Sequence, residues 1–122
     1  MKVCVTALGP KEDSEVDPRF GRCRFFVFFN LHTREVEGVA NPNIESSGGA
    51  GIQSAQLVAS KGAAIVLTGH VGPNAFKTLS AAGVSIFTGA TSTVKEAVAA
   101  YEAGKLTRAI APDSASKSGM GR

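Results

Sequence analysis

Residues 14–29 read SEVDPRFGRCRFFVFF, a polar loop that leads directly into the most aromatic segment of the chain. The Asp-Pro pair in this loop indicates a turn, because proline fixes its own φ and moves the preceding residue away from helical geometry. The near-continuous apolar run at residues 24–30 is typical of a strand buried on both faces. We therefore expect a loop carrying Arg19, Arg22 and Cys23 whose far end is held by a core strand.

The segments around this strand predict two further strands and then an alternation of helices and strands. Strands are expected at residues 2–7, 24–30, 34–40, 63–68 and 84–88, and helices at residues 51–61, 73–82 and 93–103. Short connections favour an antiparallel arrangement of the first three strands, and right-handed crossovers add the last two as parallel strands. The expected fold is α/β, a five-stranded mixed sheet flanked by three helices.

Hydrophobic periodicity also predicts which side chains face the core. In the first helix, Ile52, Ala55, Val58 and Ala59 share one face at a spacing of 3.6 residues. Cys4 lies in the middle of the first strand, where a core role is expected.

Length and composition predict one soluble domain. The chain has 122 residues, of which 43% are hydrophobic and 19% charged, which suits a globular domain over residues 1–110. Residues 111–122 have little apolar surface to bury and are expected to form a disordered tail. No apolar run reaches the roughly 18 residues of a membrane helix, and no secretory leader is visible, so a cytoplasmic location without membrane contact is expected.

The formal net charge of +3 comes from the end of the chain. Residues 1–104 contain nine Lys/Arg and nine Asp/Glu, whereas residues 105–122 contain four basic residues and one acidic residue. A charge-balanced body argues against nucleic acid as a partner.

Topology predicts where the loops meet. The loops at residues 8–23, 48–51, 69–73 and 89–92 should converge at the carboxyl end of the parallel strands, where open α/β sheets generally bind ligands. This places Arg19, Arg22, Cys23 and His70 together, and it places His32 at the opposite end.

Glycines precede two of the expected helices at this end. Gly49 and Gly51 approach the first helix, and Gly72 approaches the second. Free N–H groups and the positive dipole end of a helix can bind an anion. An ordinary turn into a helix is the alternative, since neither segment is a phosphate-loop or GxGxxG fingerprint.

Four segments carry a resemblance to a known family. They are Val16-Asp17-Pro18-Arg19-Phe20-Gly21-Arg22-Cys23, Gly48-Gly49-Ala50-Gly51-Ile52-Gln53, Thr68-Gly69-His70-Val71-Gly72-Pro73-Asn74-Ala75-Phe76, and the segment from Thr93 to Leu106. In this order they resemble the dinitrogenase iron–molybdenum cofactor biosynthesis family, which includes NifX-like and NafY-like proteins and the C-terminal domain of NifB. The chain looks like a small stand-alone member.

The resemblance implies a ribonuclease H-like fold with strand order 3-2-1-4-5. It also implies a carrier or scaffold for an iron–sulfur or iron–molybdenum-type cluster or its precursor, with metallocofactor donor or acceptor proteins as partners. Nitrogen fixation is the process with which this family is connected.

Two side chains are candidate metal ligands. Clusters prefer thiolate and imidazole, so Cys23 and His70 could bind one, and neighbouring arginines should favour the Cys23 thiolate. The alternatives are an idle, buried cysteine and a solvated histidine. Arg19 and Arg22 could hold the negative charge of a cluster or a small anion. Arg19 could instead form a surface ion pair of little energetic value with a nearby carboxylate, Glu15 or Asp17.

Catalysis is not expected. Strand 1 has no acidic residue for a metal-dependent nuclease, and no Ser-His-Asp order or carboxylate pair stands out. The leading hypothesis is a non-catalytic carrier of a metal cluster. The alternative is a metal-free module that binds a small anion or a partner protein with the same loops.

Overall fold

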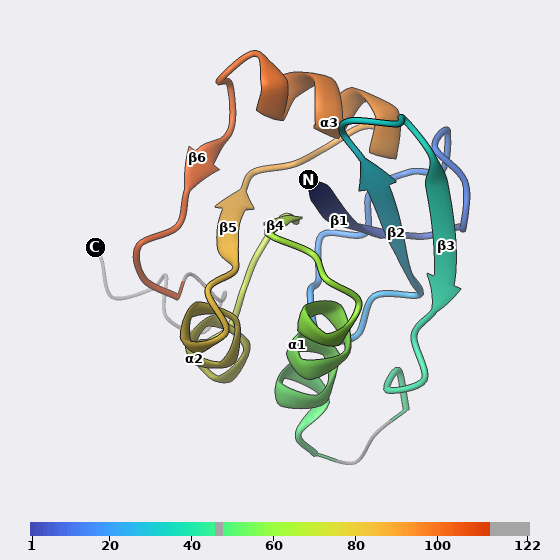
Figure 1. Ribbon diagram of the computed structural model, residues 1–122. Coiled ribbons are helices and arrows are strands. Elements are labelled where there is room, and N and C mark those ends of the chain that lie inside the picture. Colours follow the sequence, from blue (N-terminus) through green and yellow to red (C-terminus); the bar gives the residue numbers. More distant parts are fainter. Residues whose placement is uncertain (46–47, 113–122) are drawn as a thin grey trace.

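The computed structural model describes residues 1–45 and 48–112, which form a mixed sheet covered by helices on both faces (Figure 1). The strands are β1 (Lys2–Ala7), β2 (Phe25–Asn30), β3 (Val36–Ala40), β4 (Ile65–Leu67), β5 (Ser85–Thr88) and β6 (Thr107–Arg108), and the helices are α1 (Ala50–Ser60), α2 (Pro73–Ala81) and α3 (Val94–Glu102). The strand order is β3-β2-β1-β4-β5-β6. The α/β class and the expected order 3-2-1-4-5 are therefore confirmed.

The sequence pattern did not predict β6. Thr107–Arg108 pairs antiparallel with the end of β5, and the N–H of Ala109 donates to the carbonyl of Ile86 over 2.8 Å. Two exposed residues show no hydrophobic periodicity, so only their pairing with β5 identifies them as a strand. In the part of the chain that the structure describes, the sheet therefore has six strands rather than five.

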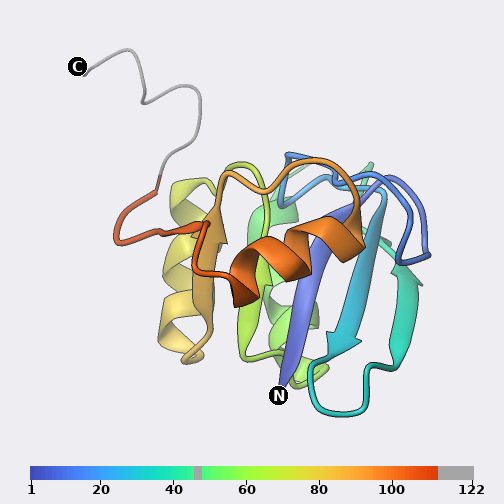
Figure 2. The same ribbon diagram turned by 90° about the horizontal axis from the view of Figure 1, so that it is seen from above.

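The middle of the sheet is buried on both faces. β1 pairs antiparallel with β2 and parallel with β4, and β4 pairs parallel with β5. Alternate side chains face opposite layers. One face, which includes Cys4, Phe26 and Phe28, packs with α1 and α2, and the other includes Val3 and Val27 and packs with α3. Figures 1 and 2 show α3 on the side of the sheet opposite α1 and α2.

The inner face of α1 differs from the expectation at one position. Ala55 and Val58 are fully buried, but Ile52 is 37% exposed. Ser54 is buried instead, and its Oγ donates to the carbonyl of Gly21 over 2.9 Å. The reason is that α1 packs against a loop as well as against the sheet, which rotates its buried stripe toward a polar residue.

The connections divide between the two ends of the sheet (Figure 2). The segments that follow β1, β3, β4 and β5 lie at one end, because these strands run in the same direction. The turn between β2 and β3 lies at the other end, near the N-terminus.

Two expectations concern other properties of the chain. Most of the tail expected to be disordered, residues 113–122, lies outside the described residues. None of the helices described here has the length and hydropathy needed to span a bilayer.

Candidate functional site

The loop between β1 and β2 is tied to the sheet by isolated β-bridges. Arg19 pairs in parallel with His70, and the N–H of His70 donates to the carbonyl of Pro18 over 2.8 Å. Val16 pairs with Ala7, and its N–H donates to a carbonyl in the β5–α3 connection over 2.8 Å. The loop is therefore ordered by backbone pairing to its neighbours, and Arg19 and His70 do lie at the same end of the sheet.

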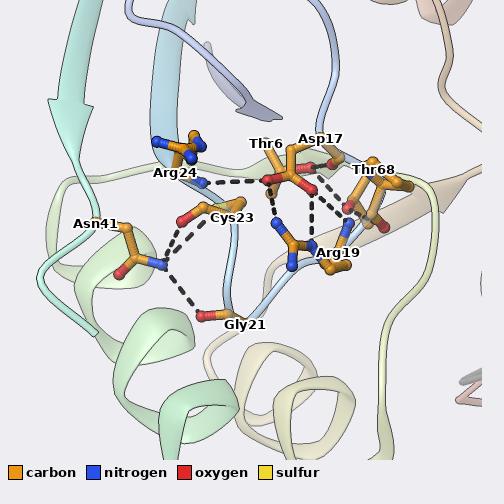
Figure 3. A network of polar contacts seen from close by, with 9 residues as sticks. Thr6, Asp17, Arg19, Gly21, Cys23, Arg24, Asn41 and Thr68 are labelled. Carbon is orange, nitrogen blue, oxygen red and sulfur yellow. Dashed lines mark hydrogen bonds and ion pairs between the residues drawn. The ribbon is translucent and has the colours of Figure 1, made fainter. Parts of the chain in front are cut away.

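A buried carboxylate lies at the centre of this loop (Figure 3). The side chain of Asp17 is only 1% exposed and accepts a bidentate ion pair from Arg19, through Nε and Nη2 at 3.2 Å each. It also accepts the backbone N–H groups of Arg19 at 3.1 Å and of Arg24 at 3.2 Å. The surface ion pair considered from the sequence is therefore half buried. Hydrogen bonding to Asp17 raises the pKa of Arg19.

Three glycines allow the loop and two helices to approach closely. A Cβ on Gly21 would lie 3.1 Å from the Cα of Gly51. A Cβ on Gly69 would lie 2.7 Å from the Cα of Pro18, and one on Gly51 would touch Ala75 at 3.4 Å. Backbone atoms take up the contacts at Gly21 and Gly69, so larger residues there would separate these segments.

The loop and the two helix starts line an open surface pocket of about 370 Å³, called the loop pocket below. Its walls come from one stretch of the β1–β2 loop, from the start of α1 and from the start of α2. They consist of Arg19, Gly21, Arg22, Gly49, Ala50, Gly51, Gly72, Pro73, Asn74 and Ala75. Of the four loops expected to converge, those at residues 8–23, 48–51 and 69–73 contribute to this pocket, whereas residues 89–92 are not among its lining residues.

The described residues that line the loop pocket include two arginines and no acidic residue. Among the described residues, neither α1 nor α2 has a side-chain cap or an acidic residue in its first turn. α3, on the other face, has a complete capping box from Thr93 and Glu96. Uncapped N–H groups and the positive helix ends favour anions. The side chain of Arg19 is 60% exposed, and Arg22 is held by a 2.9 Å bond from its Nη1 to the carbonyl of Ile44.

Cys23 does not line this pocket. Its side chain is fully buried in the core cluster with Phe20 and Phe26, and Asn41 Nδ2 contacts its Sγ at 3.9 Å. Burial is the main reason that the pKa of the Cys23 thiol is raised, and the lowering effect of Arg19 is smaller. Arg19 does favour the Cys23 thiolate, as expected, but burial outweighs this effect and raises the pKa of the thiol.

His70 is exposed and lies two residues before the pocket residue Gly72. No group of three or more His, Cys, Asp or Glu side chains in the described ranges could hold a metal ion. The residues that line the loop pocket therefore form no ligand cage for a metal ion. They suit an anion that is already assembled, because they offer guanidinium groups and helix N-termini instead of metal ligands.

Three polar residues support the pocket: Asp17, which the sequence offered as one possible partner of Arg19, and Asn41 and Ser54, which the sequence analysis missed. Asp17 holds Arg19, while Asn41 Nδ2 donates to the carbonyls of Gly21 at 3.1 Å and Cys23 at 2.8 Å. Ser54 donates to the same Gly21 carbonyl. The signal for Asp17 was its place before proline in an arginine-containing turn. Asn41 and Ser54 gave no local signal, since their partners lie 18 to 33 residues away.

Two larger surface cavities, of about 580 and 470 Å³, lie beside β3. Each is lined by acidic residues as well as by lysine. The larger one includes Lys95 at the start of α3, but that helix start is already capped by Thr93 and Glu96. The loop pocket is therefore the better candidate for an anion.

Comparison with known proteins identifies the family of the chain. Residues 1–104 match the family described as dinitrogenase iron-molybdenum cofactor. The chain belongs to this family. Within the family match lie the loop, both helix starts and every strand except β6. The family name connects the chain with a metal cluster in general.

Solved structures of similar proteins share the fold. The apo form of the orange protein from Desulfovibrio gigas is 42% identical, with a TM-score of 0.90 over 93% of this chain and 96% of that one. A Thermotoga protein proposed to be a NifB protein is 34% identical, with a TM-score of 0.78 over 88% of this chain and 91% of that one. By sequence alone, the chain is also 24% identical to an uncharacterized protein of Methanocaldococcus jannaschii, with 81% of this chain and 86% of that protein covered.

Proposed function

We propose that this protein is a non-catalytic carrier or scaffold that holds an anionic iron–sulfur or iron–molybdenum-type cluster, or its precursor, in the loop pocket. The observation that carries the proposal is the convergence of two uncapped helix starts with Arg19 and Arg22 around one cavity. Family membership supplies the chemical class of the cargo. The description of the Desulfovibrio gigas relative as an apo form also supports a ligand.

The pocket residues would hold the cargo by charge and hydrogen bonds. Arg19 and Arg22 would donate to sulfide or oxide atoms at the cluster surface, and the first N–H groups of α1 and α2 would do the same. Gly49, Gly51 and Gly72 would let the cluster approach the backbone, because they present no side chain. Such binding is exchangeable, which suits transfer between a metallocofactor donor protein and an acceptor protein.

Cys23 and His70 have different roles in this proposal. His70 lies next to the pocket and could contact a cluster from the rim. Cys23 could become a ligand only if it left the core, so we propose a structural role for it beneath the pocket.

The test is anaerobic reconstitution of the protein with iron and sulfide, with and without molybdate, followed by visible absorption spectroscopy and metal analysis. We expect bound metal in the wild type. Arg19→Gln and Arg22→Gln should each weaken binding by about tenfold or more, because a hydrogen bond to a charged group contributes about 1.5–3 kcal/mol. Arg108→Gln, on β6, removes the same charge outside the pocket and should have little effect.

Cys23→Ala completes the design. Retained cluster binding in this variant supports a cluster held by charge, and lost binding in a folded variant would make Cys23 a ligand. A wild type that binds no metal under any of these conditions contradicts the carrier function.

A metal-free module for a small anion is the second candidate. The absence of a three-residue ligand group among the described residues favours it, since the pocket offers the same groups to any anion. Binding of molybdate alone, with no cluster formed from iron and sulfide, would select this function.

A further inference from the structure

The buried carboxylate of Asp17 has no direct place in the loop pocket. Its four acceptor contacts go to Arg19, which supplies three, and to the backbone of Arg24. Both oxygens are shared, because each accepts one guanidinium hydrogen and one backbone hydrogen. The carboxylate therefore fixes the guanidinium relative to the loop that carries it.

The backbone of Asp17 is fixed in turn to the two central strands. Its N–H donates to the carbonyl of Thr6 over 2.9 Å, and its own carbonyl accepts from Thr6 Oγ1 over 2.6 Å. Thr6 Oγ1 also lies 2.8 Å from Thr68 Oγ1. Thr6 is the second-last residue of β1, and Thr68 directly follows β4. The position of the carboxylate is thus determined by the rigid part of the sheet.

The arrangement holds an otherwise mobile side chain at the pocket. An arginine that is 60% exposed can adopt many rotamers, and ordering it opposes binding. The two parallel contacts to Asp17 select one of them in advance. Figure 3 shows the Arg19 guanidinium on the side of Asp17 that faces the helices, and Arg19 lines the cavity with the starts of α1 and α2.

We infer that Asp17 is a positioning residue, which orients Arg19 toward an anion in the loop pocket. This role rests on the anion binding proposed above. Charge alone predicts the opposite effect, because a carboxylate near the pocket repels an anion. The two effects therefore differ in sign, which makes the role of Asp17 measurable.

The first experiment measures molybdate binding to the wild type and to Asp17→Asn by calorimetry or by NMR titration. Asparagine keeps the size and one acceptor oxygen but removes the charge and places a donor where Arg19 needs an acceptor. We expect the Kd to rise about three- to tenfold, although the variant is more positive by one charge. Unchanged or tighter binding would overturn the positioning role.

A double-variant cycle separates positioning from general loosening of the loop. If Asp17 acts through Arg19, Asp17→Asn should cause no further loss of affinity in an Arg19→Gln background. A further loss of similar size would mean that Asp17 only maintains the loop, and would overturn the role.

The last readout needs no ligand. The Arg19 Nε–H should have an order parameter typical of a rigid group in the wild type, and a value below about 0.6 in Asp17→Asn. An equal value in both proteins would overturn the positioning role, even if the wild type binds no anion. Failure of the wild type to bind any anion, with Arg19 rigid only when Asp17 is present, would instead contradict the proposed carrier function.

Discussion

At the scale of single residues, the two cysteines show how burial determines chemistry. Cys4 and Cys23 are both fully buried in the same core cluster. Burial is the largest cause of the raised pKa of each thiol. Deprotonation would place an uncompensated charge in an apolar region, so both groups stay neutral in the folded protein.

Alkaline pH should therefore destabilise the fold. The unfolded thiols lose their protons near the ordinary value of 9.0, whereas the folded thiols keep theirs to higher pH. Between these two pKa values the native state binds more protons than the unfolded state, so the free energy of unfolding falls as pH rises. The slope reaches about 1.4 kcal/mol per pH unit for each thiol. Below the unfolded pKa the effect vanishes.

Urea unfolding of the wild type and Cys23→Ala at pH 8, 9 and 10 measures this slope. The variant has lost core contacts and should be less stable at every pH, but its stability should decline less steeply by the contribution of one thiol. Parallel curves for the two proteins would show that Cys23 titrates normally in the fold.

At the scale of elements, glycine contacts determine how closely the β1–β2 loop approaches the helix starts. Gly69 follows β4 and lies against Pro18, where an added Cβ would meet backbone atoms. Gly49, the residue before α1, has φ +74°, a conformation that glycine adopts readily. The contact between Gly69 and Pro18 joins two separate segments, so it positions the walls of the loop pocket rather than the helices themselves.

Gly69→Ala should push the loop away from β4. The new Cβ would lie 2.7 Å from the Cα and Cβ of Pro18, and overpacking of this kind costs about 1–3 kcal/mol. We expect a lower melting temperature and weaker anion binding. Gly48→Ala is the matched control, because an added Cβ there meets none of the described residues within 4 Å, and the stability of this variant should change by less than about 0.5 kcal/mol. Equal stability of the two variants would refute the close approach.

At the scale of the whole molecule, parallel strands bring the candidate site to one end of the sheet. The two histidines of the chain lie at opposite ends of the sheet, because one follows β4 and the other lies between β2 and β3. His70 pairs with Arg19 beside the loop pocket, and His32 lies in the turn between β2 and β3. The NMR signals of the two imidazoles can therefore show at which end of the sheet a ligand binds.

Titration of the wild type with molybdate should move the imidazole NMR signals of His70 and leave those of His32 unchanged. The reason is that an anion changes the local field and solvation only near its site, and exposed charges beyond about 10 Å are screened at 0.1 M salt. A His70→Gln variant assigns the two signals. Equal movement of both would indicate non-specific binding to the surface and would remove the loop pocket as the site.

Local patterns were sufficient to predict the three helices, five of the six strands in the described part of the chain, and the end of the sheet where the loops meet. The apolar run of β2, the capping residues of α3 and the glycines before α1 and α2 act over a few residues, so they are readable in order along the chain. The family motifs agree with that topology. The convergence of Arg19, Arg22, Gly49, Gly51 and Gly72 follows from strand direction alone.

Contacts between distant segments decided the rest. The burial of Cys23 and Asp17, the exposure of Ile52 and the pairing of β6 all depend on partners that sequence spacing does not reveal. The physical reason is that protonation, burial and strand edges are set by which surfaces pack together in space. Residue type and periodicity describe each segment separately, and the chemistry of this pocket arises where three of them meet.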